Sequence, residues 1–264
     1  MTDKLKFMAN LSDCNDESSS NYHCEGVDFE VDEDVLSIGI KKLHLVPKKK
    51  LVVFDLNGLL IYRDHMVNKF SFPEDRCPDG VYGSQVVYKR PFLEKFMKFC
   101  LQRFEVGIWS ACQLHNINGI LGCVLQDFKS RFLFVWNQDH CSNYGYRMPG
   151  NKRKPLFFKE LTKLWSNLGL QFSESNTLLI DDDPYKALLN PANTGIFLDT
   201  YNVKDATDNA LYLKNELGLF LEGLADAKDV PSYVKLHRIG QPAVGPTHPD
   251  WDFYSTIRGC RFKN

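Results

Sequence analysis

The chain has 264 residues, of which 44% are hydrophobic and 25% are charged, and its formal net charge is −1. This composition is ordinary for a globular protein and excludes collagen-like, coiled-coil and fully disordered classes. The near-neutral charge gives no indication of direct nucleic-acid binding. The longest mostly apolar stretch, residues 51–62, contains Asp55 and Asn57 and is shorter than the ~20 apolar residues of a transmembrane helix. We therefore expect a soluble protein without a membrane span.

The N-terminal segment differs in charge from the rest of the chain. Residues 1–34 hold ten acidic residues and two lysines, a net charge of −8, and show no hydrophobic periodicity. Such a composition buries too little apolar surface to fold, so residues 1–45 are predicted to be an acidic, disordered tail. The segment lacks Arg and the apolar core of a secretory signal. Together with eight scattered cysteines, these features favour the cytoplasm or nucleus.

Strand and helix patterns alternate along the rest of the chain. In chain order, the sequence predicts a strand at 51–54, an insertion or flap at 62–89 with an edge strand at 85–88, a helix opened by Pro91, a strand at 105–109, a helix at 113–126 and a strand at 132–136. A loop at 137–154, a helix at 156–168, strands at 177–180 and 196–198, a helix at 203–224 and an irregular extension over 227–264 follow. This alternation predicts βαβ units and a mainly parallel sheet, which is an α/β fold.

Three polar segments follow predicted strands, namely residues 55–57, Ser110 and residues 181–183. Ligands of parallel α/β sheets bind beyond the carboxyl ends of the strands, so these segments are expected around one crevice. Carboxylates that converge there repel each other unless a cation joins them, and hard oxygen ligands favour Mg²⁺ over zinc. A cation with an exposed carboxylate, a hydroxyl and a lysine suits phosphoryl transfer. The alternative is that Asp55 and residues 181–183 only form turns.

Four short segments resemble the motifs of a known superfamily. They are residues 55–59 (DLNGL), 109–112 (WSAC), 159–161 (KEL) and 179–182 (LIDD), and they fall in the order of the four haloacid-dehalogenase (HAD) motifs. Over residues 46–226 the chain is most similar to the RNA polymerase II CTD phosphatase-like domains, also called NLI-interacting-factor-like domains. The resemblance implies a HAD-like Rossmannoid three-layer fold, with a mainly parallel central sheet and a small insertion or flap after the first strand.

The resemblance also implies catalytic roles. Asp55 would be the nucleophile that takes the phosphoryl group as an aspartyl phosphate. The Ser110 hydroxyl would bind a phosphoryl oxygen, and Lys159 would neutralise the nucleophile and the transferring oxygens. The residues alone leave alternatives, because Ser110 also suits a helix cap and Lys159 a solvated helix face. Arg90 either reaches the site or pairs with a surface acid.

The cofactor implied by the same resemblance is Mg²⁺. Its side-chain ligands would be Asp55 and Asp182, and Asp181 would orient them or bind the ion as well. Asn57 would contribute its backbone carbonyl, as the residue two positions after the nucleophile does in this family. The implied partner is a phosphorylated protein or peptide.

The chain departs from the family pattern at Asn57. Active members have Asp there, which acts as general acid to the leaving oxygen and as general base to the attacking water. An amide exchanges no proton at neutral pH, and general acid–base catalysis supplies roughly 10²–10⁴-fold in rate. The sequence therefore predicts a phosphoserine/phosphothreonine phosphatase-like protein that is weak or inactive, a pseudophosphatase.

Two alternative functions stay open. One is a non-catalytic binding module, such as the presequence-receptor subunit of the mitochondrial inner-membrane import translocase, which would place the protein in the mitochondrion. The lack of a transit peptide and of a membrane span argues against that location. The other is an aryl-phosphate phosphatase, because a phenolate leaves without much protonation.

Overall fold

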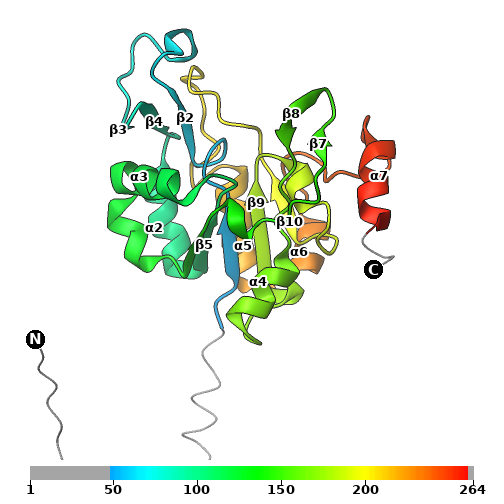
Figure 1. Cartoon of the computed structure of the whole chain (residues 1–264). Coiled ribbons are helices and arrows are strands. Elements are labelled where there is room, and N and C mark those ends of the chain that lie inside the picture. Colours follow the sequence, from blue (N-terminus) through cyan, green and yellow to red (C-terminus); the bar gives the residue numbers. More distant parts are fainter. Residues whose placement is uncertain (1–47, 261–264) are drawn as a thin grey trace, which may run out of the picture. The chain divides into compact units, whose positions relative to one another are not determined.

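The computed structural model describes residues 48–260, so the predicted acidic tail over residues 1–45 lies outside the described residues. The strands are β1 (Leu51–Phe54), β2 (Ile61–His65), β3 (Gly80–Tyr82), β4 (Gln85–Lys89), β5 (Glu105–Trp109), β6 (Phe134–Trp136), β7 (Arg147–Met148), β8 (Asn151–Pro155), β9 (Thr177–Asp181) and β10 (Gly195–Phe197). The helices are α2 (Leu93–Arg103), α3 (Leu114–Val124), α4 (Leu161–Leu168), α5 (Glu216–Asp226), α6 (Val230–Leu236) and α7 (Trp251–Cys260), with several short 3-10 helices such as η5 (Pro184–Ala187) (Figure 1).

A parallel five-stranded sheet forms the centre of the described chain, in the order β10-β9-β1-β5-β6. Strand β1 lies in the middle, where Val53 pairs with Gly107 of β5 on one side and with Leu179 of β9 on the other. All four residues of β1 are inaccessible to solvent, as the run of apolar residues predicts for a strand that is covered on both faces. The α/β fold with a mainly parallel sheet is thereby confirmed.

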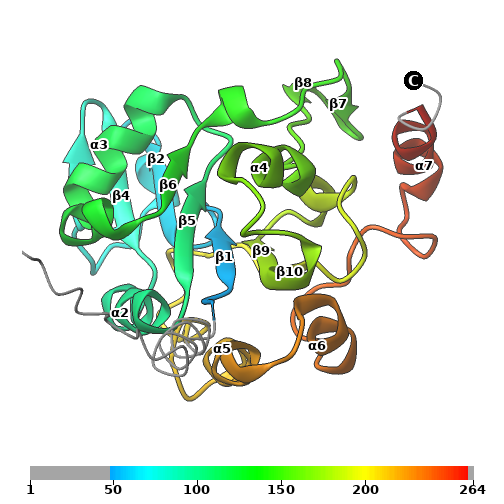
Figure 2. The same cartoon turned by 90° about the horizontal axis from the view of Figure 1, so that it is seen from below.

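Helices cover both faces of this sheet and give three layers. Val52 and Phe54 of β1 pack in one apolar cluster with side chains of α2, α3, α5 and α6. Leu51 and Val53, which alternate with them, pack against α4 on the other face. Figure 2 shows α2 and α5 on one side of the sheet and α4 on the other. Burial of each large aliphatic side chain stabilises the fold by about 1.5–3 kcal/mol.

Two smaller antiparallel pairings lie on the side toward which β9 points (Figure 1). The predicted flap forms a three-stranded sheet in the order β2-β4-β3, so the strand predicted at 85–88 is central in it and not an edge strand. In residues 137–154, predicted to be a loop, β7 and β8 form a hairpin. Strand β8 has the sequence NKRKP and is mostly exposed, so it carries no apolar alternation that would have revealed it.

The predicted helices at 156–168 and 203–224 are both shorter in the structure. Helix α4 begins at Leu161, because Phe158 before it exchanges backbone hydrogen bonds with Ser142. Helix α5 begins at Glu216, and residues 203–215 form turns. In those turns the Asp205 and Asp208 carboxylates accept backbone N–H groups two residues onward, which offers the backbone an alternative to the helix.

The extension over residues 227–264, predicted to be irregular, contains two helices. Helix α6 has Asp229 as its N-cap, which accepts the backbone N–H of Ser232, and a proline in its first turn. Helix α7 packs through Tyr254 and Ile257 against the cluster that contains Phe158. Among the described residues, no helix has the length and apolar character needed to cross a membrane.

Candidate active site

Three buried carboxylates meet at the carboxyl ends of β1 and β9. Asp55 follows β1, and its backbone N–H donates to the Ile180 carbonyl at 2.9 Å. Asp181 is the last residue of β9 and Asp182 is the next. Each of the three contributes an oxygen such that all lie within 4.8 Å of one another. The strand pairing of β1 with β9 therefore brings together the carboxylates that the sequence analysis expected around one crevice.

The ammonium group of Lys159 lies between two of these carboxylates. Its Nζ is 2.7 Å from Asp55 Oδ1 and 2.6 Å from Asp181 Oδ2, and the side chain is fully buried. Burial alone would lower the pKa of Lys159, but the attraction of Asp181 and Asp55 raises it above its usual value. Asn190 holds the backbone here by donating to the Lys159 carbonyl at 2.8 Å. Lys159 precedes α4 and does not lie on a solvated helix face.

A second buried ammonium, that of Lys186, was missed by the sequence analysis. Its Nζ is 2.8 Å from Asp181 Oδ1 and 3.2 Å from Asp55 Oδ2. Burial would lower the pKa of Lys186, but Asp181, Asp55 and two further carboxylates raise it well above the usual value. The side chain is therefore charged at neutral pH. The available signal was its spacing, because Lys186 follows Asp182 by four residues on a turn opened by Pro184.

The two ammonium groups affect Asp181 and Asp182 differently. Burial would raise the pKa of Asp181, but Lys159 and Lys186 hold it well below its usual range. Burial, with the repulsion of Asp55, raises the pKa of Asp182 to about 7, although Lys186 opposes this rise. The Oδ2 of Asp182 accepts a hydrogen bond from the Thr200 hydroxyl at 2.8 Å. Its Oδ1 accepts no hydrogen bond within the described part of the chain.

The predicted residues Asn57 and Ser110 share a pocket of about 460 Å³ with Asp55 and Asp182. The buried Oδ1 of Asn57 has no hydrogen-bond partner among residues 48–260. Ser110 is buried at the end of β5, and its N–H donates to the Trp136 carbonyl. The first residue of α3 is Leu114, so Ser110 is not the N-cap of that helix. The pocket therefore contains the hydroxyl and the amide that the resemblance places there.

Gly58 permits the close approach of the loop after β1 to Asp182 after β9. Its φ is +91°, a left-handed conformation that favours glycine. A Cβ atom at this position would overlap the carboxylate of Asp182. Its N–H donates to the Ile61 carbonyl at 2.8 Å, which closes the loop between β1 and β2.

Arg90 does not reach the site. Its guanidinium pairs with Asp208, with Nη2 2.8 Å from Oδ2, and both side chains are buried. It also donates to the Leu59 carbonyl at 3.1 Å, which supports the loop that carries Gly58. Of the two alternatives left open for Arg90, the structure shows pairing with an acid, but the pair lies in the interior.

The carboxylate oxygens of Asp55, Asp181 and Asp182 do not suit Mg²⁺ while Lys186 contacts them. Mg²⁺ requires near-octahedral oxygen ligands at about 2.0–2.1 Å. Both oxygens of Asp55 and both oxygens of Asp181 already accept hydrogen bonds from an ammonium group. The only carboxylate oxygen of the predicted ligands without a hydrogen bond is Oδ1 of Asp182, within the range that the structure describes. Asp182 Oδ1 is itself 3.5 Å from the Lys186 ammonium.

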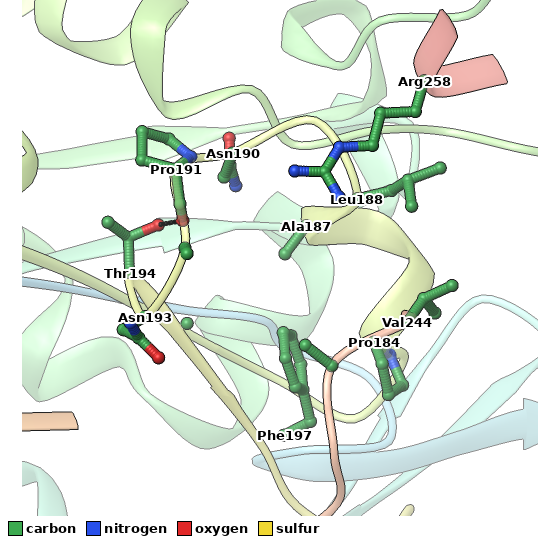
Figure 3. A pocket seen from close by; sticks show the side chains of 13 residues that line it. Pro184, Ala187, Leu188, Asn190, Pro191, Asn193, Thr194, Phe197, Val244 and Arg258 are labelled. Atoms are coloured by element: carbon green, nitrogen blue, oxygen red, sulfur yellow. Dashed lines mark hydrogen bonds between the residues drawn. The ribbon is translucent and has the colours of Figure 1, made fainter. Parts of the chain in front are cut away.

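A second pocket lies beside η5 and α7 and has a volume of about 180 Å³ (Figure 3). Its wall includes Pro184, Pro191, Phe197 and Val244, and the Arg258 side chain extends over it from α7. It contains none of the residues that the sequence analysis assigned to catalysis or metal binding. The pocket around Asp55 is therefore the candidate active site.

Comparisons with known proteins identify a family. A model described as NLI interacting factor-like phosphatase matches residues 50–231. An FCP1 homology domain-containing protein of Schizosaccharomyces pombe is 26% identical over 154 residues, which cover 55% of this chain and 59% of that protein. Ubiquitin-like domain-containing CTD phosphatase 1 of Xenopus laevis is 22% identical over 184 residues, covering 63% of this chain and 52% of the relative. The chain thus spans little more than half the length of these relatives.

The solved structures that align with this chain include that of the fission yeast RNA polymerase II CTD phosphatase Fcp1. It superimposes with a TM-score of 0.41 and 14% sequence identity, covering 87% of this chain and 67% of that chain. The family model covers more than half of this chain and includes all four predicted motifs. The chain therefore belongs to the NLI interacting factor-like phosphatase family.

Proposed function

We propose that the pocket binds a phosphorylated serine or threonine side chain of a protein and hydrolyses it weakly or not at all. One observation carries this proposal. Asp55 lies at the pocket between the ammonium groups of Lys159 and Lys186, and the same pocket contains an amide, Asn57, where the acid–base carboxyl is expected. The names of the CTD phosphatase relatives support a phosphoprotein ligand. The acidic composition of residues 1–34 supports a cytoplasmic or nuclear location as part of the same proposal.

The chain's own residues account for the first half of a phosphoryl transfer. An oxygen of Asp55 would bond to phosphorus while the bond from phosphorus to the serine oxygen breaks, which leaves an aspartyl phosphate and a serine alkoxide. Lys159 would neutralise the charge on the transferring oxygens, and the Ser110 hydroxyl would donate to one of them. Because both Asp55 oxygens accept hydrogen bonds from lysines, its attack is expected to be slow.

Asn57 impairs the proton transfers of both halves of the reaction. The departing alkoxide needs a proton, and an amide does not supply one at neutral pH. The water that would then cleave the aspartyl phosphate needs a base, which the amide also fails to provide. Loss of general acid–base catalysis lowers the rate by roughly 10²–10⁴-fold. An aryl phosphate avoids the first difficulty only, because a phenolate leaves without a proton.

A second candidate function is a binding module without turnover. The observation that favours it is the ion-pair network itself, because the four hydrogen bonds from Lys159 and Lys186 occupy every oxygen of Asp55 and Asp181. Lys154 and Lys186 at the pocket wall would still offer ammonium groups to a phosphate. The mitochondrial presequence receptor is the non-catalytic module that the resemblance suggested.

Restoring the acid at position 57 tests the proposal. Asn57→Asp replaces an amide by a carboxyl of nearly the same shape, so we expect turnover of a phosphoserine peptide to rise about 10²-fold or more. The assay measures phosphate release from this peptide and from p-nitrophenyl phosphate, each with Mg²⁺ and with EDTA. Asn118→Asp, an exposed site on α3, is the control for added charge, and Asp55→Asn is the inactive control.

The outcomes separate the candidate functions. Peptide turnover that appears with Asn57→Asp and disappears with Asp55→Asn supports the phosphatase-like function. Wild-type activity on p-nitrophenyl phosphate alone supports an aryl phosphatase. If folded Asn57→Asp hydrolyses neither substrate, the phosphatase proposal is wrong, and selective binding of the phosphorylated peptide in an anisotropy assay would then establish the binding module.

A further inference from the structure

We propose that the ammonium group of Lys186 is a built-in cation, which takes the position of a divalent metal between the carboxylates and makes the site independent of Mg²⁺. The inference concerns the same pocket as the proposed function, but it does not rest on phosphoryl transfer and is tested without measuring turnover.

The contacts of Lys186 are those expected of a central cation. Its Nζ lies 2.8 Å from Asp181 Oδ1, 3.2 Å from Asp55 Oδ2 and 3.5 Å from Asp182 Oδ1. A fourth carboxylate, that of Asp183, is also 3.5 Å away at the pocket wall. The oxygens of Asp55, Asp181 and Asp182 within 4.8 Å of one another are the group that otherwise suits a metal ion. One side chain of this protein therefore contacts every carboxylate of that group.

The backbone fixes Lys186 in this position. Its N–H donates to the Asp183 carbonyl at 3.1 Å within the η5 turn. Its carbonyl accepts the N–H of Lys159 at 2.8 Å, so the two lysines are joined through their backbones as well as through shared carboxylates. The side chain is 7% exposed, so it is largely screened from solvent. A buried ammonium is stable only with counter-charges, and here four carboxylates supply them.

Electrostatic repulsion also opposes a metal beside Lys186. Two ammonium groups, Lys159 and Lys186, already offset most of the charge of Asp55, Asp181 and Asp182. A Mg²⁺ ion added to the same oxygens would lie within a few ångströms of the Lys186 ammonium. Like charges at that separation repel strongly in a buried site. Binding of Mg²⁺ therefore requires the departure of Lys186 from its carboxylates.

The test measures Mg²⁺ binding to the full chain by calorimetric titration and by thermal unfolding with MgCl₂ or EDTA. We expect the wild type to show no binding and the same Tm in both solutions. Lys186→Met keeps the length of the side chain and removes the charge, so it should lower Tm and create a Mg²⁺ site. At a hundredfold excess of Mg²⁺ over Kd, its Tm should rise by roughly 5–10 °C.

Lys154→Met is the matched control. Lys154 lies at the rim of the same pocket, 3.7 Å from Asp183, and its side chain is 45% exposed. We expect this variant to behave as the wild type does. Stoichiometric Mg²⁺ binding by the wild type would overturn the inference, and so would a folded Lys186→Met that gains no Mg²⁺ site. If Lys186→Met does not fold, Lys186→Ser prepared in MgCl₂ replaces it, with the same expected gain of a Mg²⁺ site. If neither variant folds, the wild-type titration decides: Mg²⁺ binding overturns the inference and its lack supports it.

Discussion

The buried ion pair of Arg90 and Asp208 determines how firmly the loop beside the pocket is held. The Arg90 guanidinium donates to both oxygens of Asp208, with three contacts at 2.8–3.1 Å. The two side chains are 3% and 9% exposed. The same guanidinium donates to the Leu59 carbonyl, directly after Gly58 in the pocket wall. We therefore expect Asp208→Ala to destabilise the domain markedly.

The magnitude follows from the burial of the pair. Loss of one partner leaves a buried guanidinium without its counter-ion, which costs about 3–5 kcal/mol. The bond to Leu59 and the contact of Arg90 with the Tyr201 ring, 5.4 Å from its centroid, remain. We therefore expect a loss of about 3 kcal/mol, or roughly 6–12 °C in Tm for a domain of this size. The double substitution Arg90→Met with Asp208→Leu should recover most of this loss, because it removes both charges.

Thermal and urea unfolding followed by far-UV circular dichroism measure the effect. Glu222→Ala is the control, because Glu222 forms an exposed pair with Arg103 at 3.3 Å. Exposed pairs contribute about 0–1 kcal/mol, so this variant should unfold almost as the wild type does. A loss in Asp208→Ala no larger than that in Glu222→Ala would refute the reasoning, since water would then have replaced the missing carboxylate.

Two further predictions concern single residues. Gly58→Ala should lower the free energy of unfolding by about 1–3 kcal/mol, because the φ of Gly58 is +91° and a Cβ there would overlap Asp182. Gly122→Ala in α3 should be neutral or stabilising in the same urea assay, because no neighbouring atom lies within 4 Å of the added Cβ. Cys77 is exposed and should react rapidly with a maleimide at mildly alkaline pH. Burial raises the pKa of Cys141 to about 11, so mass spectrometry should find Cys141 modified only after unfolding. Rapid labelling of Cys141 in the native protein would contradict this prediction.

The central strands and the location of the pocket were predictable from local sequence patterns. Residues 51–54 form a run of four apolar side chains, which predicted a strand buried on both faces. The rule that ligands bind beyond the carboxyl ends of parallel strands then predicted that Asp55, Ser110 and residues 181–183 share a site. The structure brings these residues together, and both predictions needed only a local pattern or a general property of parallel sheets.

The structure of other segments depends on interactions that cannot be predicted from the spacing of apolar residues. Residues 203–215 carry helix-like apolar spacing, but Asp205 and Asp208 bond to the backbone of turns, and Asp208 is also held by Arg90. Strand β8 is polar and exposed, so only its pairing with β7 makes it a strand. Helix α7 is stabilised through packing with Phe158, which is distant in the sequence.

The buried position of Lys186 depends on long-range packing and could not be predicted from its local sequence. In the sequence it is a lysine on a short polar turn, where an exposed side chain is the ordinary expectation. Its ammonium is buried because the pairing of β1 with β9 brings Asp55, 131 residues away, next to Asp181. A charge leaves water only where opposite charges already converge, and that convergence does not exist until the sheet has formed.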